Sequence, residues 1–309
     1  MRLVLMLVLA ASTAASSACD IGKLTVGTTA KVLLRAQPSL QQESDYELAR
    51  QAIPGALKTV EGFWIVDPEN ENLIQILTEG YCQYGTGFAE DDWEAARLVK
   101  DRAAVEYHNE RATKIFNRCL NYALLSLGKE WQRDLFGDEA TVTKLLRDHG
   151  GRGKRFAMMY AGVALGSLVN HNLSQMEMLG YLPTVEMVLN HVVELDRQKP
   201  PANLAHAALP YIALGMIHTG RPVAMGGQPD RARGYFEQAL RVSGGKFLLA
   251  RTLMGYRVGL AKNDRKFFHD QLKQVLETAP SVWPEQRLAN EVAHRKARRY
   301  LSKEKELFP

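Results

Sequence analysis

The sequence contains none of the residue patterns that mark the common catalytic and metal sites. Its eight histidines are scattered, and none forms His-Glu-x-x-His or another known ligand spacing. It has no Gly-x-Ser-x-Gly segment, which carries the nucleophile of many hydrolases. Residues 149–154 are rich in glycine, but Arg155 stands where a phosphate-binding loop needs Ser or Thr. We therefore expect no catalytic residue, no metal site and no cofactor, and infer that the protein is not an enzyme.

Long apolar runs and strand-like alternation are also missing. After residue 20, no stretch reaches the roughly eighteen consecutive apolar residues that a membrane-spanning helix needs. No segment of useful length alternates with period two and carries β-branched side chains, so we expect no sheet. The net charge is only +5 in 309 residues and does not collect in one arm, which argues against a nucleic-acid partner.

The first eighteen residues have the layout of a secretory signal. Arg2 is their only charge, Leu3 to Ala11 is a short apolar run, and small residues follow. Residues 16–18 read Ser-Ser-Ala before Cys19, and small residues before a cysteine suit a bacterial lipoprotein peptidase. The usual pattern has Leu in place of Ser16, so ordinary cleavage after residue 18 is the alternative. We expect residues 1–18 to be a signal peptide and Cys19 to be lipidated, which would anchor the chain to a membrane.

The two other cysteines, Cys82 and Cys119, each lie in a helical pattern. A chain of this length buries roughly three quarters of the surface that it exposes when unfolded, so it needs no disulfide framework. Free cysteine behaves as a small buried apolar side chain, whereas an oxidising compartment permits a disulfide. Of these two alternatives we expect the buried thiols.

Helical periodicity dominates the chain from residue 44 onward. Apolar side chains between Ala49 and Val60 recur at three- and four-residue steps, which marks one buried helix face. We expect a tether or short first helix over residues 19–43 and a helical repeat domain over residues 44–305. The expected helices lie near residues 45–66, 69–88, 92–127, 140–148, 155–172, 181–196, 203–219, 230–243, 246–262, 264–278 and 284–303. The predicted fold is all-α, built as an α-solenoid or a related helical array.

Three segments carry a degenerate tetratricopeptide pattern, in which small residues let two antiparallel helices approach closely. The first has Ala232, Phe236 and Ala239 on its second helix, with Gly215 on its first and a longer turn over residues 221–229. A weaker pair has Gly80 on its first helix. The second helix of this weaker pair carries Ala112, Phe116 and Cys119. A third pair, the most degenerate, carries Phe268, Leu272, Val275 and Pro280. The pattern predicts tetratricopeptide-like helix pairs.

The same region resembles the T component of tripartite ATP-independent periplasmic (TRAP) transporters. Residues 226–240 read Gly-Gly-Gln-Pro-Asp-Arg-Ala-Arg-Gly-Tyr-Phe-Glu-Gln-Ala-Leu. The resemblance covers about residues 45–300 and continues through these positions: 52–58, Glu61, Asp67, Pro68, Leu73, Tyr84, Phe88, Asp91, Leu195, Asp196, His206, 243–247, Asp264, Phe268, Leu272, Val275, Leu276, 288–290, Ala293, Ala297, Arg298 and Arg299. One departure lies at residues 158–167, where the family has a Trp- and Tyr-rich helix. A cavity-lining role for those aromatics is therefore not expected here.

The resemblance implies a periplasmic lipoprotein of a Gram-negative bacterium, anchored at Cys19. The resemblance also implies a homotrimer with a central pore. It further implies docking to a periplasmic solute-binding protein, the DctP-like P component, and hand-over of a small hydrophobic ligand. A tetratricopeptide-like lipoprotein scaffold for envelope or pilus assembly is the alternative function.

Three other features have an ordinary structural explanation. Asp91 and Asp92 begin a helix, where negative charge suits the helix dipole. The basic C-terminal segment 295–305 is typical of a solvated helix, and the cations around the glycine-rich loop suggest a solvated loop. An aromatic cluster is either a packed core, which we favour, or the lining of an apolar groove, and its members are Trp64, Tyr81, Tyr84, Phe88 and Trp93.

Overall fold

The computed structural model describes residues 21–309, so the expected signal peptide and Cys19 lie outside the described residues. The described chain is helical throughout and contains no strand, which confirms the all-α prediction. After a helix over residues 21–36, its main helices are α2 (Pro38–Gln41), α3 (Tyr46–Val66), α4 (Glu71–Tyr84), α5 (Glu90–Leu98), α6 (Arg102–Leu127), α7 (Lys129–Asp134), α8 (Glu139–His149), α9 (Arg155–His171), α10 (Met176–Leu179), α11 (Leu182–Gln198), α12 (Leu204–Thr219), α13 (Pro229–Val242), α14 (Leu248–Lys262), α15 (Arg265–Glu277), α16 (Arg287–Ser302) and α17 (Glu304–Leu307).

Capping side chains start several of these helices. Asp45 accepts hydrogen bonds from two backbone N–H groups at the start of α3, and Asn70, Asp101, Asp138 and Asn203 cap later helices in the same way. A π-helical turn, η1 (Gly85–Ala89), joins α4 to α5 without a break in the chain's direction. The predicted connection at residues 128–139 instead contains α7, because Trp131 is fully buried there and its indole N–H donates to the His149 carbonyl.

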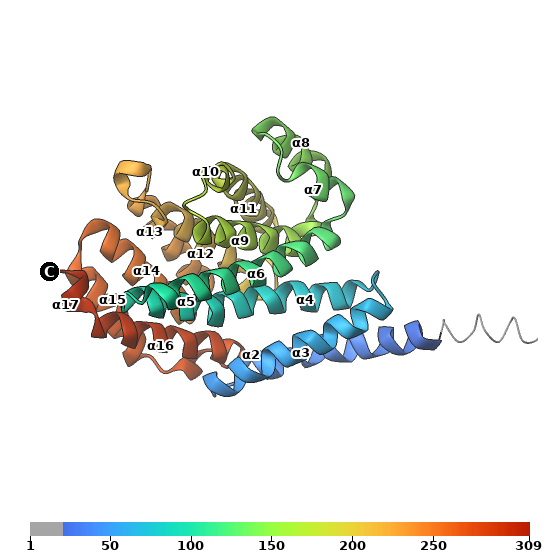
Figure 1. Cartoon of the computed structure of the whole chain (residues 1–309), viewed down its shortest axis with the longest axis horizontal. Helices are drawn as coiled ribbons and strands as arrows, with labels where there is room; N and C mark the ends of the chain where they lie inside the picture. Colours follow the sequence, from blue (N-terminus) through green and yellow to red (C-terminus); the bar gives the residue numbers. More distant parts are fainter. Residues whose placement is uncertain (1–20) are drawn as a thin grey trace, which may run out of the picture.

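Neighbouring helices pack in chain order and form an array (Figure 1). The larger contacts run from α4 to α6, α6 to α9, α9 to α11, and onward through α12, α13, α14 and α15. The array then returns on itself, because α16 contacts α2 and α3 near the start of the chain (Figure 1). Two apolar clusters form the core, and their buried members lie between Val26 and Phe308. A chain that begins at residue 20 therefore contains the whole described core.

The three predicted repeats correspond to three packed helix pairs. In α12 and α13, the Phe236 ring packs on Gly215, and Ala232 and Ala239 are fully buried. In α14 and α15, Phe268 packs on Gly259. These two pairs follow the expected pattern.

The pairing of α4 with α6 differs from the prediction at one residue. The Phe116 ring packs on Gly85 rather than on Gly80, and Gly80 instead receives Leu57 of α3. The close approach therefore lies one and a half turns further along the chain, because η1 carries the helix onward past α4.

We expect Gly215→Ala to lower the free energy of unfolding by roughly 1–3 kcal/mol. The added Cβ would lie 2.8 Å from the Phe236 ring, so the pair must separate. Gly55→Ala on α3 is the matched control, because nothing lies within 4 Å of the added Cβ. That control should be stabilised by roughly 0.5–1 kcal/mol, since alanine favours the helix. Urea denaturation of both variants measures the difference, and an equal effect at the two glycines would contradict the close approach.

Candidate functional site

Two apolar cavities lie inside the array. The larger cavity has a volume of about 170 Å³ and is lined from α2, α3, α4, α9, α12 and α16. The smaller cavity has a volume of about 110 Å³ and is lined mainly from α9, α12 and α14. Thr86, Val163, Leu209 and Leu249 line both cavities, so the two share one wall. Small apolar ligands bind in spaces of this kind, and the shared wall places the two spaces side by side.

Four polar residues that line the larger cavity gather around the carboxylate of Glu79, which lies behind them: Gln41, Gln83, Tyr160 and His206. This carboxylate is buried, and its Oε1 accepts hydrogen bonds from Gln83 Nε2 at 2.9 Å and from the Tyr160 hydroxyl at 3.2 Å. His206 Nε2 lies 3.0 Å from the same oxygen, and Gln41 Nε2 donates to it at 3.4 Å. Burial and the neighbouring carboxylate raise the pKa of Tyr160 well above its usual value, so its hydroxyl stays a donor. His206 thus has a defined place in the cavity wall that the sequence pattern did not assign.

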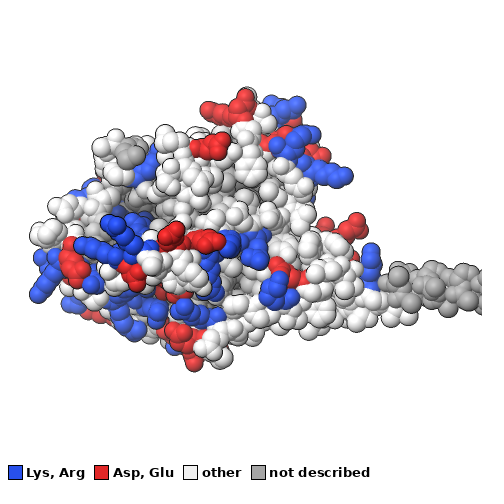
Figure 2. Space-filling view, in the orientation of Figure 1, with Lys and Arg blue, Asp and Glu red and all other residues white. Residues whose placement is uncertain are grey.

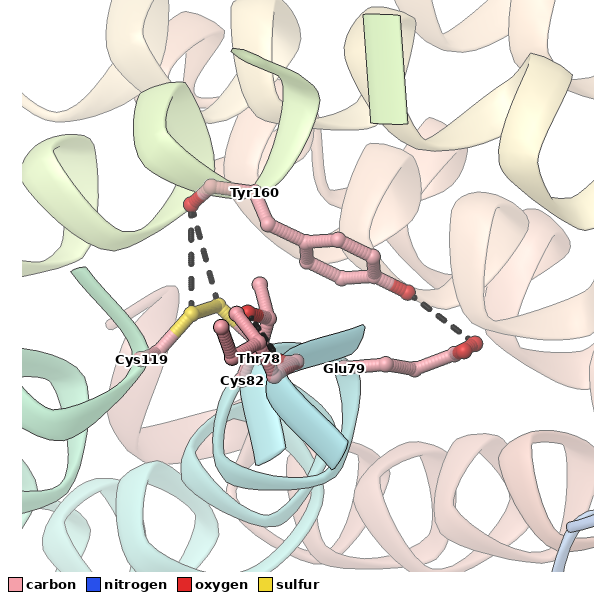
Figure 3. The surroundings of a disulfide bond; sticks show 6 residues. Thr78, Glu79, Cys82, Cys119 and Tyr160 are labelled. Atoms are coloured by element: carbon pink, nitrogen blue, oxygen red, sulfur yellow. Dashed lines mark hydrogen bonds between the residues drawn. A yellow bond between two sulfur atoms is a disulfide. The ribbon is translucent and has the colours of Figure 1, made fainter. Parts of the chain in front are cut away.

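Cys82 and Cys119 form a disulfide between α4 and α6, with their Cα atoms 5.2 Å apart. The prediction of buried free thiols was wrong, because the two helices pack closely enough to bring the cysteines within bonding range. Both sulfur atoms lie against the Tyr160 carbonyl oxygen, at 3.8 and 3.9 Å (Figure 3). Since Cys82 also lines the larger cavity, the disulfide and Tyr160 together hold one side of its wall.

A buried ion cluster joins α5 to α16. Asp91 is fully buried, and its carboxylate accepts hydrogen bonds from Arg299 at 2.5 Å and from Arg295 at 3.1 Å. Lys296 Nζ lies 3.3 Å away and completes a set of three cations. Asp91 lies in the first turn of α5, as the sequence predicted, but it is buried and paired there. The interpretation of segment 295–305 as a solvated helix was wrong at Lys296, which is buried. On the face shown in Figure 2, basic and acidic side chains lie close together over this end of the molecule.

Glu94 forms the second half of the ion cluster. It accepts hydrogen bonds from Lys296 and from the Tyr300 hydroxyl, the latter at 2.6 Å, and Arg257 lies 3.6 Å away. Burial opposes ionisation of both Glu94 and Asp91, but the charge of Lys296, reinforced by Arg257 at Glu94, lowers both pKa values below their usual range. Both acids are therefore ionised at neutral pH, and they neutralise the cations that α16 buries.

Glu90 differs from its two acidic neighbours. It is buried in the wall of the smaller cavity, where Asn170 Nδ2 donates to it at a long 3.4 Å. Among the described residues, only His171 is within ion-pair distance, at 3.7 Å. Burial, reinforced by the charge of Glu94, raises the pKa of Glu90 to about 7. A carboxyl with this pKa takes up a proton near neutral pH in the wall of a mainly apolar cavity.

We expect Glu90→Gln to stabilise the protein at about pH 8 but to have little effect at about pH 5. The pKa of Glu90 is higher in the folded protein than in the unfolded chain. Between these two pKa values the unfolded chain releases the proton while the folded protein keeps it. The free energy of unfolding therefore falls as pH rises from the lower pKa to the higher one. Relative to the variant, wild type should lose roughly 2 kcal/mol over this range. Denaturant unfolding at both pH values measures it, and a pH-independent difference between the proteins would contradict the assignment.

The sequence model of the TRAP transporter T-component family matches residues 42–308. The chain belongs to the TRAP transporter T-component family. It is therefore an accessory component of a TRAP transport system, in agreement with the resemblance found in the sequence. The search of curated proteins found no match.

Helix α9 borders both cavities of this T component. Its segment 158–167 contains small side chains where the resemblance led us to expect aromatics. Gly162 and Gly166 line the smaller cavity, Val163 lines both, and Tyr160 lines the larger one. The glycines of α9 thus leave the wall of the smaller cavity without bulky side chains at these two positions.

The predicted aromatic cluster is largely core. Tyr81, Tyr84, Phe88 and Trp93 are buried, and Trp64 is half-buried with its ring edge-on to Tyr122. Of the five, Phe88 lines the larger cavity. The core interpretation is therefore confirmed for the cluster, and the groove interpretation holds at Phe88.

The glycine-rich loop does not present the cations that the sequence suggested. Arg155 is buried and forms a two-bond ion pair with Asp196, at 2.6 and 2.9 Å. Arg152 donates to the carbonyls of residues 195 and 199, and Lys154 donates to the Ser126 carbonyl at 2.7 Å. The solvated-loop interpretation was wrong at Arg155, which is buried, whereas Gly151 and Gly153 are exposed as expected. The hydrogen bonds of Arg152 and Lys154 hold the loop against α11 and the end of α6.

Among residues 21–309, no three His, Cys, Asp or Glu side chains are placed to hold a metal ion. No helix in the same range is long and apolar enough to cross a membrane.

Proposed function

We propose that this T component is a periplasmic lipoprotein that docks the solute-binding P component of its transporter and passes a small apolar ligand through the two cavities. The observation that carries this proposal is the pair of adjacent apolar cavities, because they supply apolar space inside the helical array and only the side chains of the shared wall lie between them. The family supplies the transport setting. A homotrimer, as the resemblance implies, would present three such paths.

Binding of an apolar fluorescent dye tests the cavities. Leu209→Trp places an indole in the shared wall and should weaken binding of a naphthalene-type dye at least tenfold, because little free volume remains. Leu125→Trp on the exposed side of α6 is the control and should bind the dye as wild type does. The melting temperatures of both variants show whether they fold.

Two further variants separate the cavities. Ala56→Trp fills the larger cavity and Ala213→Trp fills the smaller one, because each residue lines only one of them. If the ligand spans the shared wall, each variant should weaken binding by itself. Wild-type affinity in Leu209→Trp, or in both single-cavity variants, would reject the passage.

The lipid anchor has its own test. In cells, Cys19→Ser should move the protein from the membrane fraction to the soluble periplasmic fraction, since the thiol that accepts the lipid is gone. The protein's size, compared with that of wild type, shows whether processing occurs. An unchanged membrane fraction with normal processing would reject lipidation at Cys19.

A further inference from the structure

The helix over residues 21–36 carries charge of one sign. Lys23, Lys31 and Arg35 are its charged residues, and it contains no acid. All three are exposed, and none forms an ion pair with any residue that the structure describes. Elsewhere in the described chain many exposed cations are paired, such as Lys262 with Asp230. Within the described residues, this helix therefore presents positive charge that no acid pairs with, at one end of the molecule.

The same helix is apolar on two sides. Its inner side packs into the core through Val26 and Ala30, which are buried. Its outer side exposes Ile21, Leu24 and Val32, whose exposed fractions are 63%, 72% and 62%. A helix that needed only to cover the core would not require apolar residues on its solvent side.

An open groove runs beside the outer side of the helix. Lys23 and Lys31 line it together with Ile21 and Leu24, and Asn70 and Asn72 from the turn before α4 form its other wall. The groove has a volume of about 560 Å³. The two lysines lie about 12 Å apart along the helix axis, so phosphate groups can approach both.

We propose that helix 21–36 lies on the surface of a phospholipid leaflet, with anionic lipid phosphates at Lys23 and Lys31 and with Ile21 and Leu24 inserted among the acyl chains. Basic residues beside exposed apolar ones are the composition that holds a helix in a membrane interface. The placement also agrees with chain order, because residues 1–20 lead directly into this helix, at the tip of the described chain in Figure 1.

The contact orients the protein on the membrane. It is made by the helix itself, so it requires neither the lipid at Cys19 nor transport activity. A lipid at Cys19 would add to it, because a single anchoring signal is weak and a second one makes the attachment stable.

Vesicle co-sedimentation of a chain that begins at residue 20 tests this contact. This chain contains the whole described core but neither the apolar signal nor Cys19. We expect it to bind phosphatidylcholine vesicles with about 30% phosphatidylglycerol and to bind pure phosphatidylcholine at least tenfold more weakly, because each basic residue contributes about fivefold near an anionic surface. Added salt should weaken the binding. Equal binding to both vesicle types, or none to either, would overturn the proposal.

A triple variant and a matched control separate binding through this helix from attraction by the net charge of the protein. K23E/K31E/R35E should lower binding to the anionic vesicles at least tenfold. The control, K129E/K144E/R241E, changes the net charge equally at exposed residues that form no ion pair with a described residue, and it should bind nearly as wild type does. Equal losses in the two triple variants would overturn the proposal.

The variant I21S/L24S tests the proposed insertion of the two apolar side chains among the acyl chains. We expect weaker vesicle binding and unchanged mass by light scattering, because these side chains contact lipid. Retained vesicle binding together with loss of an oligomer would show that this face contacts a second copy of the chain and would overturn the lipid assignment. Melting temperatures near that of wild type confirm that each variant is folded.

Discussion

Asp91→Ala should lower the free energy of unfolding by about 3–5 kcal/mol. The substitution leaves Arg295, Lys296 and Arg299 without their shared anion, and Lys296 has almost no access to water. The cost is therefore that of burying positive charge, which exceeds the value of any single hydrogen bond. Urea denaturation at neutral pH measures this loss directly.

Asp92→Ala is the matched control for that experiment. Asp92 neighbours Asp91 in sequence, but its partner Arg50 is partly exposed. We expect a loss of about 1 kcal/mol or less, as for other accessible ion pairs. Similar losses at the two positions would mean that the ion cluster does not hold α16 against α5.

The ion cluster also makes a prediction about acid stability. Because the pKa values of Asp91 and Glu94 are lowered in the folded state, their contribution is present above the unfolded pKa near 4 and is lost as pH falls below it. Wild type should therefore lose more stability than Asp91→Ala as pH falls below about 4.

Removing the disulfide is expected to have an effect of similar size. The double variant Cys82→Ala/Cys119→Ala should lose about 4 kcal/mol, because the bond closes a loop with a sequence separation of 37 and so restricts the unfolded chain. Denaturant unfolding under oxidising conditions measures this loss.

Reduction provides the control for the disulfide. A strong thiol reductant should lower the stability of wild type toward that of the double variant and leave the variant unchanged, since the variant has no bond to break. Wild-type stability in the oxidised double variant would contradict the contribution assigned to the bond.

Local spacing predicted the repeats, because the residues that decide them lie close together in the sequence. Phe236 and Gly215 face each other across a single helix pair, so the small and large positions can be recognised without the rest of the fold. Local spacing could not predict the π-helical turn η1, nor which glycine Phe116 contacts. A π-helical turn shifts the contact from Gly80 to Gly85 without any break in the helical pattern.

Long-range pairings needed the structure. Glu94 meets Lys296 across a sequence separation of 202, and the periodicity of α16 only shows that it has one buried face. The sequence of a basic helix does not distinguish a buried cation from an exposed one. For this reason segment 295–305 was predicted to be solvated although Lys296 is buried. The disulfide was missed for a related reason, because it depends on the register between two packed helices.

The cavities could be predicted only in part from the sequence. Their lining comes from several helices, so no single motif marks them. One signal was present: segment 158–167 has small residues where the resemblance led us to expect large aromatics. That departure placed the cavity role of the aromatics in doubt, and the structure shows free space along the same helix.

Cross-linking and co-purification of the full-length chain from its native envelope test the central claim most directly. If the protein acts as a T component that docks a partner, the purified material should contain a periplasmic solute-binding protein of the same transport system, together with a trimer of this chain. Recovery of the chain as a monomer, or with envelope or pilus assembly proteins and no solute-binding protein, would contradict the account.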